Sequence, residues 1–152
     1  MSSPSSVIDA STPQTGRSLL ELICSGDVPP PAAADLLGID LERVGDGETT
    51  FGFDARAAYG NPGSVHGGVL AAIADFAVTT AIWTLVPLST DVSTTDLNVS
   101  YFKRLHLDDA RYRCTGRVVH LGRTQANAVA DVVDAAGTVY LHAAATCRLT
   151  RI

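Results

Sequence analysis

The sequence predicts one α+β domain in which a curved antiparallel sheet wraps around one long buried helix. Residues 67–88 are apolar on nearly every helical face, which is typical of a helix buried on all sides. After Pro87 the chain alternates apolar and polar residues with a period of two, as strands with one buried face do. A strongly curved sheet would cover such a helix on several sides, and short turns between strands favour antiparallel pairing.

Length, composition and charge set the class of protein. The chain has 152 residues, 46% of them hydrophobic, which is enough for one domain that buries about two thirds of its unfolded surface. A net charge of −5 argues against a general nucleic-acid binder, because phosphate contacts need a basic face. Six of the eleven basic residues nevertheless lie between Lys103 and Arg123, which is compatible with a local anion site.

The N-terminal residues and the cysteines indicate a cytoplasmic protein. Residues 1–16 are polar and lack the basic and apolar parts of a signal peptide, so we expect a flexible tail ahead of a single domain over residues 17–152. The three cysteines form an odd set without metal-ligand spacing, and we interpret them as buried thiols in a reducing compartment. Residues 67–88 approach the length of a membrane span, but Asp75 within them favours a buried helix.

The first half of the chain predicts a short helix, two strands and a loop ahead of the long helix. The helix covers residues 17–25, where leucines and isoleucine form one stripe, and Gly26 ends it. Three prolines then form a stiff connector. The elements that follow are a strand over 39–44, a turn at 45–47, a strand over 48–54 and a loop over 55–65.

The second half predicts the rest of the sheet. Apolar residues alternate with polar ones in four segments, namely 96–101, 111–118, 125–131 and 139–149. Turn residues at Gly122-Arg123 and Ala136-Gly137 separate the last three of these strands. A single sheet has open edges, and a second copy of the chain would close them.

Four segments carry a resemblance to a known family. They are VHGGVLAAIAD, where Asp75 follows Gly67 by eight residues, and then STTDLNVSYFKRL, HLGRTQANAVADVVD and AGTVYLHAAATCRL. On these residues the chain resembles the hot-dog-fold acyl-CoA thioesterases, the group that includes phenylacetate-degradation and 4-hydroxybenzoyl-CoA thioesterases. The resemblance covers about residues 39–149. It implies the hot-dog fold, hydrolysis of an acyl-CoA to the free acid and CoA, a homodimer or homotetramer, and no metal or organic cofactor.

Gly67 and Gly68 stand where the long helix would begin. The first N–H groups of a helix have no internal acceptor, and the helix dipole places positive charge there. Glycine lets a substrate carbonyl approach these donors closely, which makes an oxyanion hole, and one such donor is worth about 3 kcal/mol in the transition state. A tight turn that needs no side chain would also explain both glycines.

Asp75 is the candidate base or nucleophile. A carboxylate in apolar surroundings is poorly solvated and therefore more reactive, although a structural acid held by hydrogen bonds would fit the same position. Asp75 lies two helical turns beyond Gly67, about 12 Å along the axis, so the two residues of one chain cannot contact one carbonyl. The resemblance implies that Gly67 of one subunit and Asp75 of the other form a shared site, with two sites per dimer and an inactive monomer.

Four further residues are candidates for the site through the resemblance. His66 would orient the loop or contact the substrate, and Thr79, one turn after Asp75, would support the acid. Thr94 matches a position where a hydroxyl orients water. Relatives carry an Asn six residues before the histidine, whereas Asn61 lies five before it, so either Asn61 takes that role or the contact is missing.

Arginines of the second half are candidates for the CoA phosphates. Arg123 follows Gly122 in a turn common among relatives and ranks first, ahead of Arg111 and Arg113 on one strand face. Arginine suits phosphates because it forms bidentate contacts, but a solvated strand face would also explain each of these residues. The other histidines, His106 and two more, show no metal-ligand spacing.

Two other functions remain open from the sequence. The first is a hydratase or dehydratase on the same fold, because NPGSVH resembles its D-x-N-P-x-H loop but lacks the leading Asp. The second is a non-catalytic acyl-CoA-binding protein, which would typically lack the acid at position 75. The acyl group, aryl or aliphatic, and the choice between direct base catalysis and a mixed anhydride on Asp75 are also open.

Overall fold

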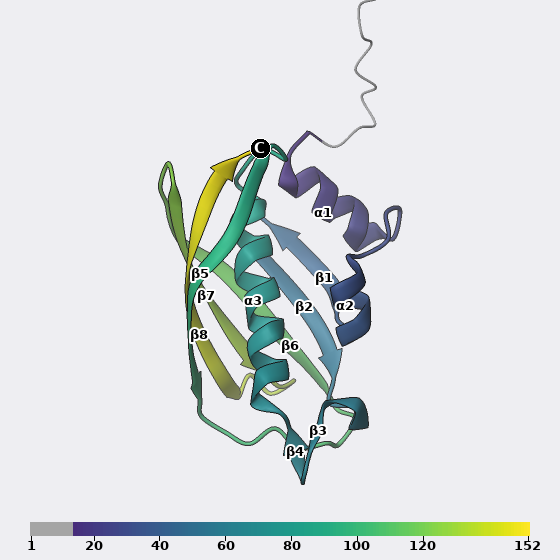
Figure 1. Cartoon of the computed structure of the whole chain (residues 1–152). Helices are drawn as coiled ribbons and strands as arrows, with labels where there is room; N and C mark the ends of the chain where they lie inside the picture. Colours follow the sequence, from purple (N-terminus) through teal and green to yellow (C-terminus); the bar gives the residue numbers. More distant parts are fainter. Residues whose placement is uncertain (1–13) are drawn as a thin grey trace, which may run out of the picture.

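The computed structural model describes residues 14–152 and shows a long helix held against a curved sheet (Figure 1). The elements in chain order are α1 (Gly16–Ser25), α2 (Ala32–Leu37), β1 (Asp40–Gly45), β2 (Glu48–Asp54), the 3-10 turn η1 (Ala57–Tyr59), β3 (Gly60–Asn61), β4 (Ser64–Val65), α3 (Gly67–Trp83), β5 (Thr90–Tyr101), β6 (Arg111–Leu121), β7 (Gln125–Val133) and β8 (Val139–Arg151).

The main sheet has six strands in the order β1-β2-β6-β7-β8-β5, and every neighbouring pair is antiparallel. Its concave face contacts α3 through five of these strands, β2 and β5 to β8. The predicted α+β fold, with a curved antiparallel sheet around one long buried helix, is therefore confirmed. β1 and β5 are the open edges, and β3 and β4 form a separate short hairpin before α3.

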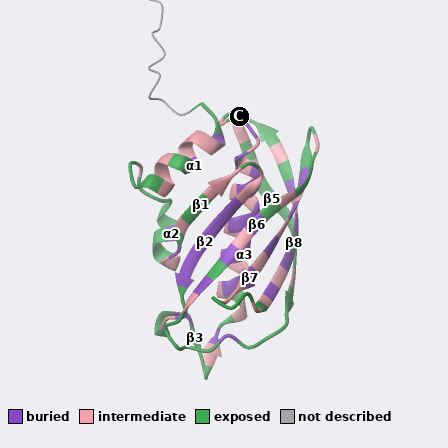
Figure 2. Cartoon of the chain, turned by 180° about the vertical axis from the view of Figure 1, so that it is seen from behind, coloured by how far each residue is buried: buried purple, intermediate pink, exposed green. Residues whose placement is uncertain are grey.

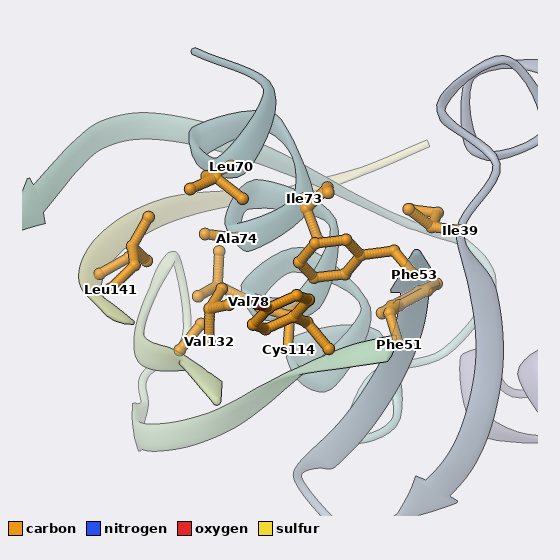
Figure 3. Packing of buried hydrophobic residues seen from close by; sticks show 14 of the residues in the cluster. Ile39, Phe51, Phe53, Leu70, Ile73, Ala74, Val78, Cys114, Val132 and Leu141 are labelled. Atoms are coloured by element: carbon orange, nitrogen blue, oxygen red, sulfur yellow. The ribbon is translucent and has the colours of Figure 1, made fainter. Parts of the chain in front are cut away.

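The core lies between α3 and the concave face of the sheet (Figure 3). Ile73, Ala74 and Val78 of α3 are fully buried against strand residues such as Phe53 and Leu141. Burial of each large apolar side chain stabilises the fold by about 1.5–3 kcal/mol. Few faces of α3 meet water, which explains why residues 67–83 are apolar on nearly every side.

Gly116 sets how closely β6 approaches α3. A Cβ atom built on Gly116 would lie 2.0 Å from the main-chain oxygen of Ala77, which is far inside contact distance. The helix backbone therefore packs directly on the strand at this point, and no side chain fits between them. This contact fixes the height of the middle of α3 above the sheet.

Two short helices cover the side of α3 next to β1 (Figure 1). α1 follows the prediction, with Thr15 as N-cap in a capping box with Ser18 and Gly26 as a left-handed C-cap. α2 was not predicted, because its six residues after Pro31 are too few to show a period. Residues 1–13 of the predicted tail lie outside the described residues, whereas Thr15 and Gly16 already belong to the start of α1.

Strand β2 is buried along most of its length (Figure 2), and charged side chains of β1 and β6 cover its outer face. Glu42 Oε1 accepts a hydrogen bond from Arg111 at 2.8 Å, and Glu42 Oε2 accepts one from Arg113 at 2.6 Å. Both Glu42 and Arg111 lie directly over Gly52, whose missing side chain leaves room for them. β2 is consequently buried on both faces, by α3 on one side and by these ion pairs on the other.

Candidate active site

Asp75 is a half-buried carboxylate on α3 that is held by a neighbouring strand. The Thr94 hydroxyl on β5 donates a hydrogen bond of 2.6 Å to Asp75 Oδ1. Within residues 14–152 no Lys, Arg or His side chain forms an ion pair with Asp75. Within the same residues, Thr94 is the one hydrogen-bond partner of the carboxylate, and Asp75 Oδ2 has none.

Thr79 lies on the same side of α3 as Asp75 but does not contact its carboxylate. The Thr79 hydroxyl donates to the main-chain oxygen of Asp75 at 2.7 Å and lies 3.2 Å from that of Phe76. A helical threonine commonly bonds the carbonyl one turn earlier. The structure thus brings Thr94 to the acid and leaves Thr79 bonded to the helix backbone.

The first turn of α3 has one amide that is free to bind a ligand. His66 is the N-cap, and its Nδ1 accepts a hydrogen bond of 3.0 Å from the Gly68 N–H. Its main-chain oxygen accepts from the Val69 N–H at 3.0 Å. In the part of the chain that the structure describes, the Gly67 N–H has no acceptor. Of the two predicted donors, Gly67 is the one available to a substrate oxygen.

This hydrogen bond makes His66 the N-cap of α3. Because Nδ1 accepts from Gly68, a neutral His66 ring carries its proton on Nε2. The ring thereby fixes the start of the helix, and an N-cap of this kind is worth about 1 kcal/mol. His66 was a candidate either to orient the loop or to contact a substrate, and the structure places its ring on the Gly68 N–H.

A surface pocket of about 310 Å³ opens beside the free amide of Gly67. Its walls include Asn61, Tyr101, Lys103 and Arg104. The Tyr101 hydroxyl donates to the main-chain oxygen of Gly67 at 2.7 Å, which ties the end of β5 to the start of α3. Asn61 is exposed at the tip of the β3–β4 hairpin, and its side chain makes no hydrogen bond within residues 14–152. It shares the pocket with Gly67 but does not contact Asp75.

The predicted phosphate-binding arginines lie in different surroundings. Arg111 pairs with Asp40, Glu42 and Asp54, and Arg113 pairs with Glu42. Burial alone would raise the pKa of Glu42, but its hydrogen bonds with the two guanidinium groups outweigh this effect and lower the pKa. Arg123 is exposed in the β6–β7 turn beside a separate pocket and has no ion pair within residues 14–152.

Cys147 is a neighbour of the site that the sequence did not reveal. Its Sγ lies 3.8 Å from the Thr94 hydroxyl, on the strand that pairs with β5. Burial is the main cause that raises the pKa of the Cys147 thiol, and the charge of Asp75 adds to the rise. Strand pairing, which brings residues 53 positions apart together, left no signal in the local pattern.

Residues 14–152 contain no group of three or more His, Cys, Asp or Glu side chains placed to hold a metal ion. Among the helices of these residues, none combines the length and the apolar character needed to cross a bilayer.

Comparison with known proteins identifies the family. The family model of the thioesterase superfamily matches residues 62–141, which include Gly67, Asp75 and Thr94. Comparison with curated proteins gave no significant match. The 80 residues that match the family model form more than half of the chain, and they place the chain in this family.

Solved structures share the fold over most of this chain. A phenylacetic acid degradation-related protein from Ralstonia eutropha is 27% identical, with a TM-score of 0.76 over 85% of this chain and 98% of the other. A mutant of the phenylacetic acid degradation protein PaaI from Thermus thermophilus is 25% identical, with a TM-score of 0.71 over 80% of this chain and 100% of the other.

A thioesterase from Haemophilus influenzae, only 19% identical, has a TM-score of 0.75 over 93% of this chain and 94% of the other, which supports the fold alone. Together, the family match and the shared arrangement of sheet and helix support thioester hydrolysis as the general reaction. This chain belongs to the thioesterase superfamily and has the hot-dog fold.

Proposed function

We propose that the chain hydrolyses acyl-CoA thioesters, with Asp75 as base or nucleophile and the Gly67 amide as oxyanion donor. The observation that carries this proposal is the isolation of Asp75. A structural carboxylate that is shielded from water normally has a cationic partner, whereas the half-buried Asp75 has only the Thr94 hydroxyl within residues 14–152. A carboxylate held at one oxygen and free at the other suits proton transfer or nucleophilic attack.

The site requires two chains in this proposal. Asp75 and Gly67 of one helix are separated by two turns, about 12 Å, which exceeds the reach of one carbonyl group. The open edge at β5 offers a surface on which a second copy would place its own Gly67 near this Asp75. We therefore expect a homodimer, or a dimer of dimers, with two equivalent sites and no organic cofactor or metal.

The reaction follows from these positions. A thioester carbonyl oxygen accepts a hydrogen bond from the Gly67 N–H, which stabilises the negative charge that develops on it. In one route Asp75 takes a proton from water while the water oxygen attacks the carbonyl carbon. In the other, Asp75 itself attacks, and water then cleaves the mixed anhydride. In both routes the C–S bond breaks, CoA leaves as thiolate and takes up a proton, and the acyl group leaves as the acid.

The CoA phosphates would be bound by cations that form no ion pair in the part of the chain that the structure describes. Lys103 and Arg104 line the pocket beside Gly67, and neither forms an ion pair within residues 14–152. Arg123 is likewise without an ion pair there. Binding through Arg111 or Arg113 would first break their ion pairs with Glu42, which makes these two the weaker candidates.

A thiol-release assay across a panel of acyl-CoA substrates tests the proposal. We expect kcat to fall about 10²- to 10⁴-fold in Asp75→Asn and Asp75→Ala, while both variants remain folded and dimeric. Asp96→Asn is the matched control, because Asp96 is an exposed acid on β5 near Thr94. Full turnover in either Asp75 variant, or no thiol release from any substrate by the parent protein, would contradict the proposal.

A further inference from the structure

An apolar cavity of about 180 Å³ lies on α3 one helical turn beyond Asp75. Thr79 lines it and is about 6 Å from Asp75 along the helix axis. Val92 lines it from β5 and shares a strand face with Thr94, which is two residues further on. Thr79 and Val92, which neighbour the Asp75–Thr94 pair, are thus part of the wall of this cavity, which we call the outer cavity.

A second, smaller cavity of about 40 Å³ continues inward beneath α1 and α2. Leu20 and Ile23 of α1 and Leu41 of β1 line this inner cavity. The two cavities share four lining residues, Pro31, Phe76, Thr80 and Trp83. Trp83 therefore lies at the boundary between the outer cavity and the space under the helices.

The side-chain hydrogen-bond donors that line the outer cavity are already used within the protein. The hydroxyl groups of Thr79 and Thr80 lie 2.7 Å and 2.6 Å from main-chain oxygens of α3 and donate to them. The indole N–H of Trp83 donates to the main-chain oxygen of Thr90 at 3.3 Å. Asp91, the one charged lining residue, is exposed and so marks the mouth. The chemistry of the walls fits a hydrocarbon group and disfavours an acyl group with its own carboxylate.

Two aromatic side chains of the cavity wall contact neighbouring elements. The Trp83 ring is anchored by its hydrogen bond to Thr90, and the Phe76 ring packs edge-on against Phe51 with centroids 6.1 Å apart. An apolar cavity of about 150 Å³ accommodates benzene. A cavity of about 180 Å³ therefore accepts a group of about six to eight carbon atoms.

We propose that the outer cavity binds an apolar acyl group of about six to eight carbons, and that Trp83 limits its length. This inference rests on the acyl-CoA thioesterase function proposed above and names its substrate class. The thioester carbonyl lies at Asp75, and the acyl chain runs along α3 toward Trp83. Replacing Trp83 by alanine joins the outer and inner cavities, so that longer chains fit beneath α1 and α2.

Relative rates across a chain-length series test the proposal. We expect the parent protein to have its highest kcat/KM for hexanoyl-, octanoyl- or phenylacetyl-CoA. Trp83→Ala raises the ratio of dodecanoyl- to hexanoyl-CoA turnover by about tenfold or more, since the indole no longer blocks the inner cavity. Val92→Phe fills the outer cavity instead, and lowers hexanoyl-CoA turnover about tenfold relative to acetyl-CoA.

These ratios overturn the proposal if they stay at the parent value in both variants. Val119→Ala is the matched control, because Val119 is an apolar residue of β6 that is 66% exposed and lies outside both cavities. Val92→Phe retains the indole, so it remains informative even when Trp83→Ala does not fold. Because each result is a ratio of turnover between two substrates, a general loss of activity in a variant cancels.

A binding measurement separates this inference from the hydrolysis on which it rests. Trp83 is the single tryptophan of the chain, so its fluorescence reports on the cavity directly. We expect S-hexyl-CoA, a thioether that cannot be hydrolysed, to shift the emission to shorter wavelength, whereas free CoA leaves it unchanged. An emission shift without any thioesterase activity would support acyl binding in the outer cavity and refute the proposed hydrolysis. Hydrolysis without an emission shift refutes the cavity.

Discussion

Thr94 Oγ1 lies 2.6 Å from Asp75 Oδ1 and donates a hydrogen bond to it, which joins edge strand β5 to the middle of helix α3. The bond occupies one oxygen of the carboxylate and restricts the rotation of its side chain. A hydrogen bond to a charged group is worth about 1.5–3 kcal/mol. Thr94 therefore acts as a positioning residue through Asp75 in the proposed reaction.

The first prediction concerns this bond. Thr94→Val preserves the shape of the side chain and removes the donor, so we expect kcat to fall about 10- to 100-fold with little change in KM. Thr94→Ser restores a hydroxyl and should recover most of the rate. Steady-state kinetics with acyl-CoA provide the measurement. Thr95→Val is the control, because the exposed Thr95 hydroxyl bonds the main-chain oxygen of Thr146 instead.

The second prediction concerns the oxyanion donor. Gly67 is the first residue of α3, where proline is tolerated, and the extended backbone of His66 suits a following proline. Gly67→Pro removes the N–H without breaking the helix, and we expect kcat to fall about 10²–10³-fold. Gly67→Ala keeps the N–H and is the control, although its Cβ meets the Tyr101 ring at 3.2 Å, which requires a small shift.

Mixed dimers then test whether the site is shared between subunits. A chain with Asp75→Asn and a chain with Gly67→Pro are each expected to be inactive alone. A heterodimer of the two contains one site with both native residues and should recover activity, because Gly67 and Asp75 of that site come from different chains. Absence of recovery in a purified heterodimer would show that each chain carries its own complete site.

The third prediction compares two groups of cations. Lys103→Gln and Arg104→Gln should raise KM for acyl-CoA, because both residues lack an ion pair within residues 14–152 and line the pocket at Gly67. Their effect should vanish with acyl-pantetheine substrates, which lack the nucleotide phosphates. Arg113→Gln should change stability more than KM, since its guanidinium is already bonded to Glu42. A larger KM effect at Arg113 would reverse this ranking.

The sequence predicted those helices and strands whose apolar residues repeat with a regular period. The apolar run of α3 and the alternation in β5 to β8 follow from burial on many sides or on one side, and both are local. Strand ends and α2 were missed, because a six-residue helix after Pro31 shows less than two turns of pattern. The glycine-rich start of α3 and its single acid were also local features, and the sequence alone made them candidates.

The remaining features depend on contacts between distant segments. Thr94 was selected only through resemblance, since nothing near it in sequence shows that its hydroxyl meets Asp75, 19 residues earlier. The ion pairs of Arg111 with Glu42 span 69 residues across three strands. His66 occupies the amide of Gly68, which depends on a side-chain rotamer. Register and rotamers, which decide these contacts, leave no periodic trace in a single sequence.

The fourth prediction concerns the packing of α3 on β6. Gly116→Ala places a methyl group where the main-chain oxygen of Ala77 lies, so the helix must move away from the sheet. We expect the free energy of unfolding to fall by about 3 kcal/mol or more, measured by urea titration. Gly45→Ala is the control, since its Cβ meets ordinary contacts at 3.6 Å. A loss of stability at Gly116 no larger than the control would contradict the close approach.

The last prediction concerns stability at alkaline pH. Burial raises the pKa of Cys114 from 9.0 to about 12, with the charge of Asp131 adding to the rise. Above pH 9 the unfolded thiol loses its proton while the folded thiol keeps it, so the folded state binds more protons and its stability falls as pH rises toward 12. Tyr112, whose pKa burial raises to about 12, contributes in the same direction.

Cys114→Ala isolates the contribution of this thiol. The variant loses some stability at neutral pH because it leaves a small cavity, but its stability should fall less steeply above pH 9 than that of the parent. Val132→Ala, at the cross-strand partner of Cys114, makes a cavity in the same layer without removing a titrating group and should keep the parent slope. Unfolding free energies measured by urea titration from neutral pH to about pH 11 compare the three slopes. Equal slopes in the parent and Cys114→Ala would mean that the buried thiol ionises as readily in the folded state as in the unfolded chain.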